Sequence, residues 1–227
     1  MSSKPQRPSA IANELAVAIG GDRALMLQQV GADVRPAFEA LFQVDAAMAD
    51  VVARATQPAL GAVKLAWWRE RLEELDKGKV PAEPRLAAAA RELLPRDISG
   101  SDLSRLEAGW ATLFDQTPNP EMISGRGAVL FDLGGRLLGK PDEQLADAGA
   151  LYALVAVARR GLPELLGNAR PYVERLARHR FNRRLRPLTA LARLAARDLK
   201  QGEPFEEEGI PPRLAAMLRH RWSGVVA

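Results

Sequence analysis

The sequence predicts an all-α protein, and three observations support that prediction. Alanine, leucine, arginine and glutamate dominate the chain, and all four favour helices. Runs of β-branched residues with a period of two, which are typical of strands, are absent. Apolar residues recur instead at helical spacing, and proline or glycine stands at many of the breaks between the apolar patterns.

The order of these patterns gives the expected elements. Pro36 suits a first helical turn, Pro58 with Gly61 marks a break, and Ser101 next to Asp102 suits a helix N-terminus. We expect helices near residues 10–20, 22–30, 34–55, 61–77, 84–93, 101–114, 121–139, 142–160, 170–180, 186–200 and 211–221. The segment 201–212 is expected to be a loop before a short last helix.

The chain has 227 residues, which is enough for one substantial domain. We expect residues 1–10 to be disordered and residues 11–227 to form a single helical domain. The first ten residues lack the apolar segment of a secretory signal, and the longest apolar run, 148–158, is too short to span a bilayer. These features predict a cytoplasmic protein, with peripheral contact to the inner membrane as a further expectation.

Composition excludes several kinds of site. The chain has no cysteine, so disulfides, thiolate catalysis and iron–sulfur clusters are ruled out. Two histidines are too few for a multi-histidine metal site or for an argument in favour of a catalytic triad. We therefore assign no catalytic residue from composition.

The most informative segment is 49–75, where a Pro-Gly joint is followed by a helix that opens on paired tryptophans. Leu65, Trp68 and Leu72 recur at helical spacing and predict one buried face. Trp67 lies about 100° around the helix from Trp68, so the two rings cannot pack against the same neighbour. A core helix with a solvated charged face explains this pattern, and so does a tryptophan-walled ligand cavity entered past Lys64 and Arg69.

Residues 35–72 resemble the squalene/phytoene synthase family. The matching residues are Arg35-Pro36-Ala37, Ala40-Leu41-Phe42, Pro58, Gly61 and Leu65-Ala66-Trp67-Trp68-Arg69, at the family's spacings. Looser similarity extends over roughly residues 20–222. The resemblance implies an isoprenoid-synthase-like helical bundle around a central apolar cavity. It also implies an activity that condenses two prenyl diphosphates with Mg²⁺ held by two aspartate-rich motifs.

The aspartate-rich motifs are largely missing. The first falls on residues 49–53, where Ala49 and Ala53 replace the outer aspartates and only Asp50 survives. The second falls near 159–173, where its aspartates become Arg160 and Glu164. Asp50 and Glu164 are thus vestigial metal candidates, and two carboxylates are too few for a Mg²⁺ cluster.

The chain is similar in this respect to a divergent branch that includes an assembly factor of respiratory complex I. That branch keeps the joint, here Thr56, Pro58, Gly61 and the tryptophan pair, while losing acidic positions. The resemblance favours a non-catalytic homologue, a pseudoenzyme without a cofactor, that binds an isoprenoid or lipid or assists assembly of a membrane complex with a protein partner. The alternative is a Mg²⁺-dependent prenyltransferase of isoprenoid biosynthesis with a rebuilt metal site, so enzymatic activity stays an open question at this point. In the binding hypothesis the ligand-binding residues are Lys64, Trp67, Trp68, Arg69 and Arg160.

Residues 170–200 carry an unusual excess of arginine. The segment holds ten basic residues against Glu174 and Asp198. Arginine favours bidentate contact with phosphate or carboxylate. A solvated basic face, contact with anionic lipid headgroups or a prenyl diphosphate, and nucleic-acid binding all remain open. Nucleic acid is the least favoured, because Phe181 is the one base-stacking aromatic in the central part of the segment.

Overall fold

The computed structural model describes residues 21–227, and helices account for nearly all of its regular structure. The all-α prediction is confirmed over these residues, while the helix expected at 10–20 lies outside them. The α-helices are α2 (Gly21–Gln29), α3 (Arg35–Arg54), α4 (Pro58–Leu75), α5 (Pro84–Glu92), α6 (Gly100–Ser104), α7 (Glu107–Ala111), α8 (Pro120–Leu137), α9 (Leu145–Ala158), α10 (Leu165–Leu176), α11 (Arg186–Gln201) and α12 (Pro211–Ser223). Short 3₁₀ turns, η1 (Leu94–Arg96) and η2 (Thr112–Phe114), follow α5 and α7.

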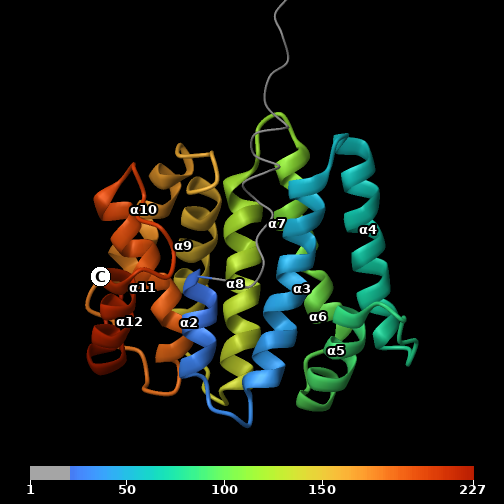
Figure 1. The fold of residues 1–227 in the computed structure, drawn as a ribbon, viewed down its shortest axis with the longest axis horizontal. Helices are drawn as coiled ribbons and strands as arrows, with labels where there is room; N and C mark the ends of the chain where they lie inside the picture. The colour runs from blue at the N-terminus through green and yellow to red at the C-terminus, as the bar shows by residue number, and fades with distance from the viewer. Residues whose placement is uncertain (1–20) are drawn as a thin grey trace, which may run out of the picture.

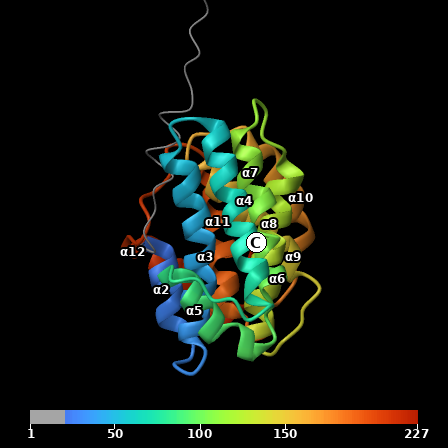
Figure 2. The same ribbon diagram turned by 90° about the vertical axis from the view of Figure 1, so that its right-hand side faces the viewer.

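Helix α8 runs through the middle of the bundle (Figure 1). Helices α9, α10, α11 and α12 lie on one side of it, and α3 and α4 lie on the other, with α4 at the outer edge. Seen from that edge, α3 and α4 run side by side (Figure 2). One continuous apolar core connects both sides, because α9 is buried over most of its length and both α8 and α11 pack against it.

Proline sets the start of many of these helices. It occupies one of the first two positions of α3, α4, α5, α8, α11 and α12. At those positions the missing N–H costs no intrahelical hydrogen bond, and the fixed φ angle suits the helix. These prolines explain why most of the expected boundaries agree with the structure to within three residues.

Two expected elements were wrong in detail. The helix expected at 101–114 is divided into α6, α7 and η2, and its N-cap is Ser99 rather than Ser101. The division occurs where Leu106 N–H bonds the carbonyl of Leu103, a three-residue spacing that tightens the helix. The helix expected at 170–180 begins five residues earlier, so Pro171 lies inside α10 and not at its start.

Helices α8 and α9 cross at a pair of glycines. A methyl group on Gly127 would lie 2.6 Å from Cβ of Ala153 and would also overlap the backbone carbonyl of Gly149. A methyl group on Gly149 would lie 2.9 Å from Cβ of Phe131. Glycine is therefore required at this crossing so that the two backbones can approach, and this close approach fixes the centre of the bundle.

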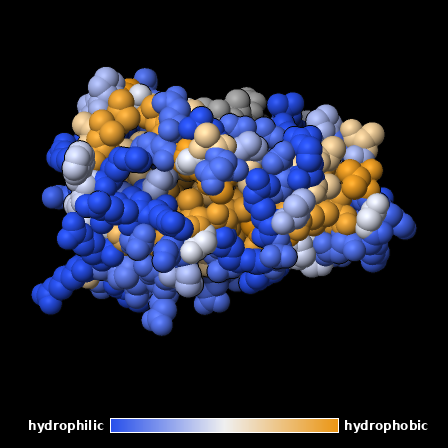
Figure 3. All heavy atoms as spheres, turned by 90° about the horizontal axis from the view of Figure 1, so that it is seen from below, coloured by the Kyte–Doolittle hydropathy of each residue, from blue (hydrophilic) through white to orange (hydrophobic). Residues whose placement is uncertain are grey.

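The surface seen from below is mostly hydrophilic, with hydrophobic patches separated from one another by charged and polar atoms (Figure 3). Residues 21–227 contain no helix that combines the length and the hydropathy needed to cross a bilayer.

Candidate functional site

The joint between α3 and α4 is a tight connection that positions the tryptophan pair. Helix α3 ends at Arg54, and α4 begins at Pro58. A side chain at Gly61 would collide with the ring of Phe114, so this glycine lets η2 pack against the first turn of α4. Trp68 is buried and Trp67 is 42% exposed, with their rings perpendicular and 5.6 Å apart between centroids. This confirms that the two rings pack against different surroundings.

The structure divides the five expected ligand-binding residues between two places. Lys64 and Arg69 are exposed on α4, beside the tryptophans, and Arg69 lies 3.9 Å from Glu107. Arg160 follows the end of α9, and Figure 1 shows α3 and α8 between α4 and α9. The four α4 residues and Arg160 therefore do not form one common site in this structure.

A buried charged cluster, which the sequence had not indicated, occupies the interior between α2, α3, α7 and α8. Its centre is Asp45, a fully buried residue on α3. Arg23 Nη2 donates to one carboxylate oxygen at 2.8 Å. Arg126 Nη1 and Trp110 Nε1 donate to the other at 2.6 and 2.9 Å. Burial alone would raise the pKa of Asp45, but the positive charges of Arg126 and Arg23 outweigh it and hold that pKa below its ordinary value.

The Asp45 cluster carries more positive than negative charge. Two guanidinium groups face one carboxylate. The other partner of Arg23, the hydroxyl of Tyr152 at 2.6 Å, is neutral and adds no negative charge. The Arg126 guanidinium stacks on Trp110 at 3.9 Å from the ring centroid, and its Nε and Nη2 have no hydrogen-bond partner among the described residues. Burial, together with the charges of Arg23 and Arg126, lowers the pKa of Arg160. Arg160 therefore belongs electrostatically to this interior and not to α4.

The positions of the replaced aspartates lie on the same inner face of α3 as Asp45. Ala49 and Ala53 are four and eight residues further along the helix, and both are buried. Asp50 points away from this face, where its Oδ2 accepts from Arg85 Nη2 at 3.2 Å. Glu164 is exposed at the start of α10.

Comparison with known proteins finds a similarity in the first half of the chain. A family model described as squalene/phytoene synthase matches residues 18–122. Over this segment the chain is similar to squalene/phytoene synthases. Neither the curated proteins nor the solved structures yield a match to the chain. The all-α architecture of residues 21–227 is consistent with the fold of this family.

The residues present do not fit the Mg²⁺ cluster that squalene/phytoene synthases imply. On the inner face of α3, the one carboxylate among positions 45, 49 and 53 is already bonded to two arginines. Within residues 21–227, three or more acidic or histidine side chains nowhere gather in a group that could hold a metal ion. A Mg²⁺ ion next to Arg23 and Arg126 would be repelled, since both guanidinium groups are buried and poorly screened.

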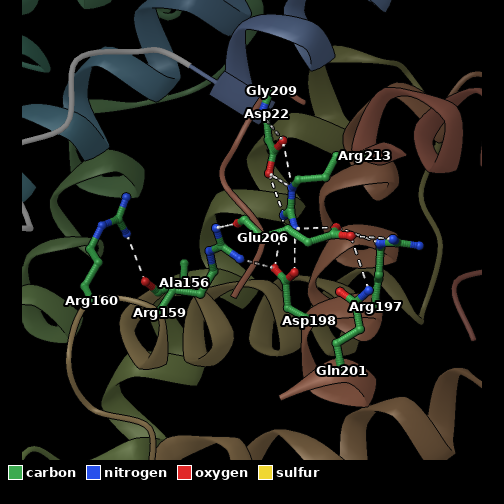
Figure 4. A network of polar contacts seen from close by, with 10 residues as sticks. All are labelled: Asp22, Ala156, Arg159, Arg160, Arg197, Asp198, Gln201, Glu206, Gly209 and Arg213. Carbon is green, nitrogen blue, oxygen red and sulfur yellow. Dashed lines mark hydrogen bonds and ion pairs between the residues drawn. The ribbon is translucent and has the colours of Figure 1, made fainter. Parts of the chain in front are cut away.

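A second charged network ties the first described helix to the last two (Figure 4). Arg213 on α12 is buried and donates to Asp22 on α2 at 2.6 Å and to Asp198 on α11 at 3.0 Å. Arg159 at the end of α9 lies 2.9 Å from Asp198, and Glu206 accepts two hydrogen bonds from Arg197. This network joins α2 to α11 and α12.

A small pocket lies between the two networks. Asp22, Arg23, Tyr152, Arg160 and Arg213 are among the residues that line it. Its volume is about 30 Å³, which is room for about one water molecule. The prenyl-sized apolar cavity expected at the centre of the bundle does not correspond to this pocket, which has room for only about one water molecule and is lined in part by charged side chains.

A much larger groove opens on the surface between α10 and α11. Its volume is about 880 Å³, in the range of pockets that hold small organic molecules. Val173 and Leu199 supply apolar wall and pack against the core. The basic residues Arg170, Arg193 and Lys200 lie around the same groove. The combination of apolar wall and positive charge suits an amphiphile with an anionic head.

The arginine-rich segment 170–200 thus has three different roles in the structure. Some arginines are neutralised or bonded internally, such as Arg175 by Asp147 and Arg186 by backbone carbonyls. Others line the groove, and a third set is exposed in the loop between α10 and α11: Arg178, Arg180, Arg183 and Arg184.

Sequence reasoning missed the Asp45 cluster for an identifiable reason. Arginine usually lies on the surface, so Arg23 and Arg126 gave no indication of burial. The available signal was Asp45 itself, the only acidic residue between positions 40 and 49 of an otherwise apolar helix segment. A carboxylate on the predicted core face needs a cationic or hydrogen-bonding partner.

Proposed function

We propose that this chain is a non-catalytic relative of squalene/phytoene synthases that binds an isoprenoid or another lipid with an anionic head. The observation that supports the non-catalytic part is the state of the inner face of α3. Asp45 is held by Arg23 and Arg126, while Ala49 and Ala53 supply no metal ligand. Diphosphate is a poor leaving group without bound cations, so ionisation of a prenyl diphosphate has no support at this position.

The groove between α10 and α11 supports the lipid-binding part of the proposal. It offers apolar wall for a hydrocarbon chain, and it offers arginine and lysine for a phosphate or carboxylate. Arg170 and Lys200 are exposed, so their charges are free to approach a ligand head from solvent. The same non-catalytic chain would suit a role in assembling a membrane complex, as in the divergent branch that the joint resembles.

A turnover assay tests the non-catalytic part. The purified chain is incubated with farnesyl or geranylgeranyl diphosphate and Mg²⁺, and released diphosphate is measured. We expect no release above the protein-free control. Release that Asp50→Ala abolishes would contradict the proposal and would establish a rebuilt metal site.

Mass spectrometry of organic extracts from the purified protein tests the lipid-binding part. We expect an anionic isoprenoid or lipid to co-purify, and we expect the double variant Arg170→Glu/Lys200→Glu to retain at least about tenfold less of it, since charge reversal opposes an anionic head. Lys79→Glu is the matched control, because Lys79 is an exposed lysine between α4 and α5. Equal retention by the groove variant, or an extract without lipid, would contradict this part.

A further inference from the structure

Helix α12 has two apolar faces, and only one of them packs against the core. Ala216 and Met217 are buried against the core. Leu214, Leu218 and Trp222 follow one another at four-residue spacing along the outer face, with 36, 45 and 81% of their surface exposed. Trp222 is the most exposed of the large hydrophobic side chains in residues 21–227. Residues 21–227 leave the exposed part of this outer stripe of α12 uncovered.

Exposed arginines surround the Trp222 end of the stripe. The loop between α10 and α11 packs beside it, because Phe181 N–H donates to Gly224 O at 2.9 Å. Arg186 also donates to the carbonyl oxygens of Arg221 and Trp222 at 2.9 and 3.0 Å. These bonds bring the loop arginines to the same end of the molecule as the stripe. The exposed basic residues there are Arg180, Arg183, Arg184, Arg219 and Arg221.

No carboxylate of these two segments balances the arginines. Residues 175–197 and 209–227 contain neither aspartate nor glutamate. Asp142, from the segment between α8 and α9, contacts His179 of the loop at 3.0 Å, but within residues 21–227 no carboxylate forms an ion pair with the five exposed arginines. Positive charge therefore dominates the surface that the α10–α11 loop and the outer face of α12 form together. Such a surface attracts a polyanion, and the neighbouring leucines and indole add an apolar contact that a purely ionic partner would not need.

The outer face of α4 provides an internal comparison. Leu60, Val63 and Trp67 also form an exposed apolar stripe, with 55, 67 and 42% of their surface accessible. Charges of both signs flank that stripe, including Lys64 and Glu70, which are both exposed. The α4 stripe therefore lacks the one-signed charge of α12, and it carries no preference for an anionic partner.

We propose that the outer face of α12 docks on the surface of an anionic lipid bilayer. Leu214, Leu218 and Trp222 enter the boundary between headgroups and acyl chains, where tryptophan is favoured because its ring is apolar and its N–H is polar. The surrounding arginines lie at the level of the lipid phosphates. This surface is separate from the groove between α10 and α11, so the inference goes beyond the proposed function and does not depend on it.

Vesicle binding by the full chain tests the inference. The protein is mixed with phosphatidylcholine vesicles in which about one lipid in three is phosphatidylglycerol, and binding is measured by co-sedimentation and by tryptophan emission. We expect binding with a blue-shifted emission, weaker binding at high salt, and little binding to pure phosphatidylcholine. Trp222→Ala should lose both the shift and at least about tenfold of the affinity, and Arg183→Glu/Arg184→Glu should lose a similar factor.

Trp67→Ala is the matched control, since it removes an exposed indole from the α4 stripe. We expect this variant to bind vesicles as the parent chain does. Unchanged urea midpoints for Trp222→Ala and Arg183→Glu/Arg184→Glu establish that lost binding is not lost folding.

Three results would overturn the inference. Equal vesicle binding by Trp222→Ala and the parent would show that the stripe does not contact lipid. A lipid-free dimer that Trp222→Ala dissociates would assign the stripe to a second copy of the chain. Binding to a DNA oligonucleotide, lost in Trp222→Ala without any vesicle binding by the parent, would assign the surface to nucleic acid. Failure of vesicle docking leaves the lipid extracts unaffected, so it is distinguishable from failure of the proposed function.

Discussion

At the level of single residues, Asp45 supplies the negative charge that the buried Arg23 and Arg126 pair with. A carboxylate that accepts from two arginines and a tryptophan cannot be removed without leaving all three donors buried. Asp45→Ala should lower the free energy of unfolding by about 3–5 kcal/mol, measured by urea denaturation. Asp50→Ala is the control, and it should cost less than about 1 kcal/mol, because the Asp50–Arg85 pair is partly exposed.

His220 should make the stability depend on mildly acidic pH. Its side chain is buried, with Nε2 2.8 Å from Thr189 Oγ1 and Nδ1 donating to Val225 O. Burial, aided by the charges of Arg193 and Arg186, lowers its pKa to about 4. In the unfolded chain the pKa is about 6.5, so between these values the unfolded state binds the proton and the folded state does not.

The sign follows from that difference. The contribution of neutral His220 to the free energy of unfolding is complete above about pH 6.5. It is lost as the pH falls towards 4, and the total loss is about 3 kcal/mol. Urea unfolding of the parent and of His220→Gln at several pH values measures it. The variant should show a shallower loss of stability over this range, whatever its absolute stability, and parallel curves would contradict the assignment.

The sequence predicted some of these residue-level features and not others. Their helical spacing alone predicts that Trp67 and Trp68 have different surroundings, and in the structure Trp68 is buried while Trp67 is exposed. The pairing of Asp45 with Arg126 joins residues 81 positions apart, and no local pattern contains that information. Fully buried arginines are rare enough that composition argues against them.

At the level of elements, the crossing of α8 and α9 depends on glycine. Gly127→Ala should destabilise the protein by about 1–3 kcal/mol, because its methyl group would overlap the backbone of α9. Gly125→Ala lies two residues away on the same helix, where a methyl group meets nothing within 4 Å. It should stabilise the protein by about 0.5–1 kcal/mol through helix propensity. Thermal denaturation of both variants measures this contrast, and equal shifts would contradict the close crossing.

Helix boundaries were predictable where proline or glycine marks them. The start of α4 at Pro58 and the start of α11 one residue before Pro187 follow from local chemistry. The break between α6 and α7 was not predictable, since Leu103, Leu106 and Trp110 are all buried as one continuous helix would also bury them. Pro171 misled the prediction of α10, because an internal proline and an N-terminal one look alike in sequence.

At the scale of the whole molecule, Arg213 links helices from the two ends of the described chain. Its guanidinium bonds Asp22 and Asp198, so one side chain holds α2, α11 and α12 together. Arg213→Met should cost about 3–5 kcal/mol, because buried Asp22 loses its cation and buried Asp198 keeps only Arg159. Hydrogen exchange should then accelerate in α2 and α12 while the amides of α8 and α9 stay protected.

Arg197→Met is the control for that measurement. Arg197 pairs with Glu206 at a partly exposed position, so its loss should change exchange little. Uniform acceleration through α8 and α9 in Arg213→Met would show that the bundle opens as one unit and that Arg213 has no local role.

The Asp22–Arg213 pair also has a consequence for the newborn chain. The two residues are 191 positions apart, so a ribosome adds most of the protein before Asp22 meets its cation. Until then α2 carries a carboxylate that favours water over the core. The contact of α2 with α12 is therefore a late event of biosynthesis, formed only when the helix that carries Arg213 has been translated, whereas the Arg23–Asp45 pair joins residues only 22 positions apart.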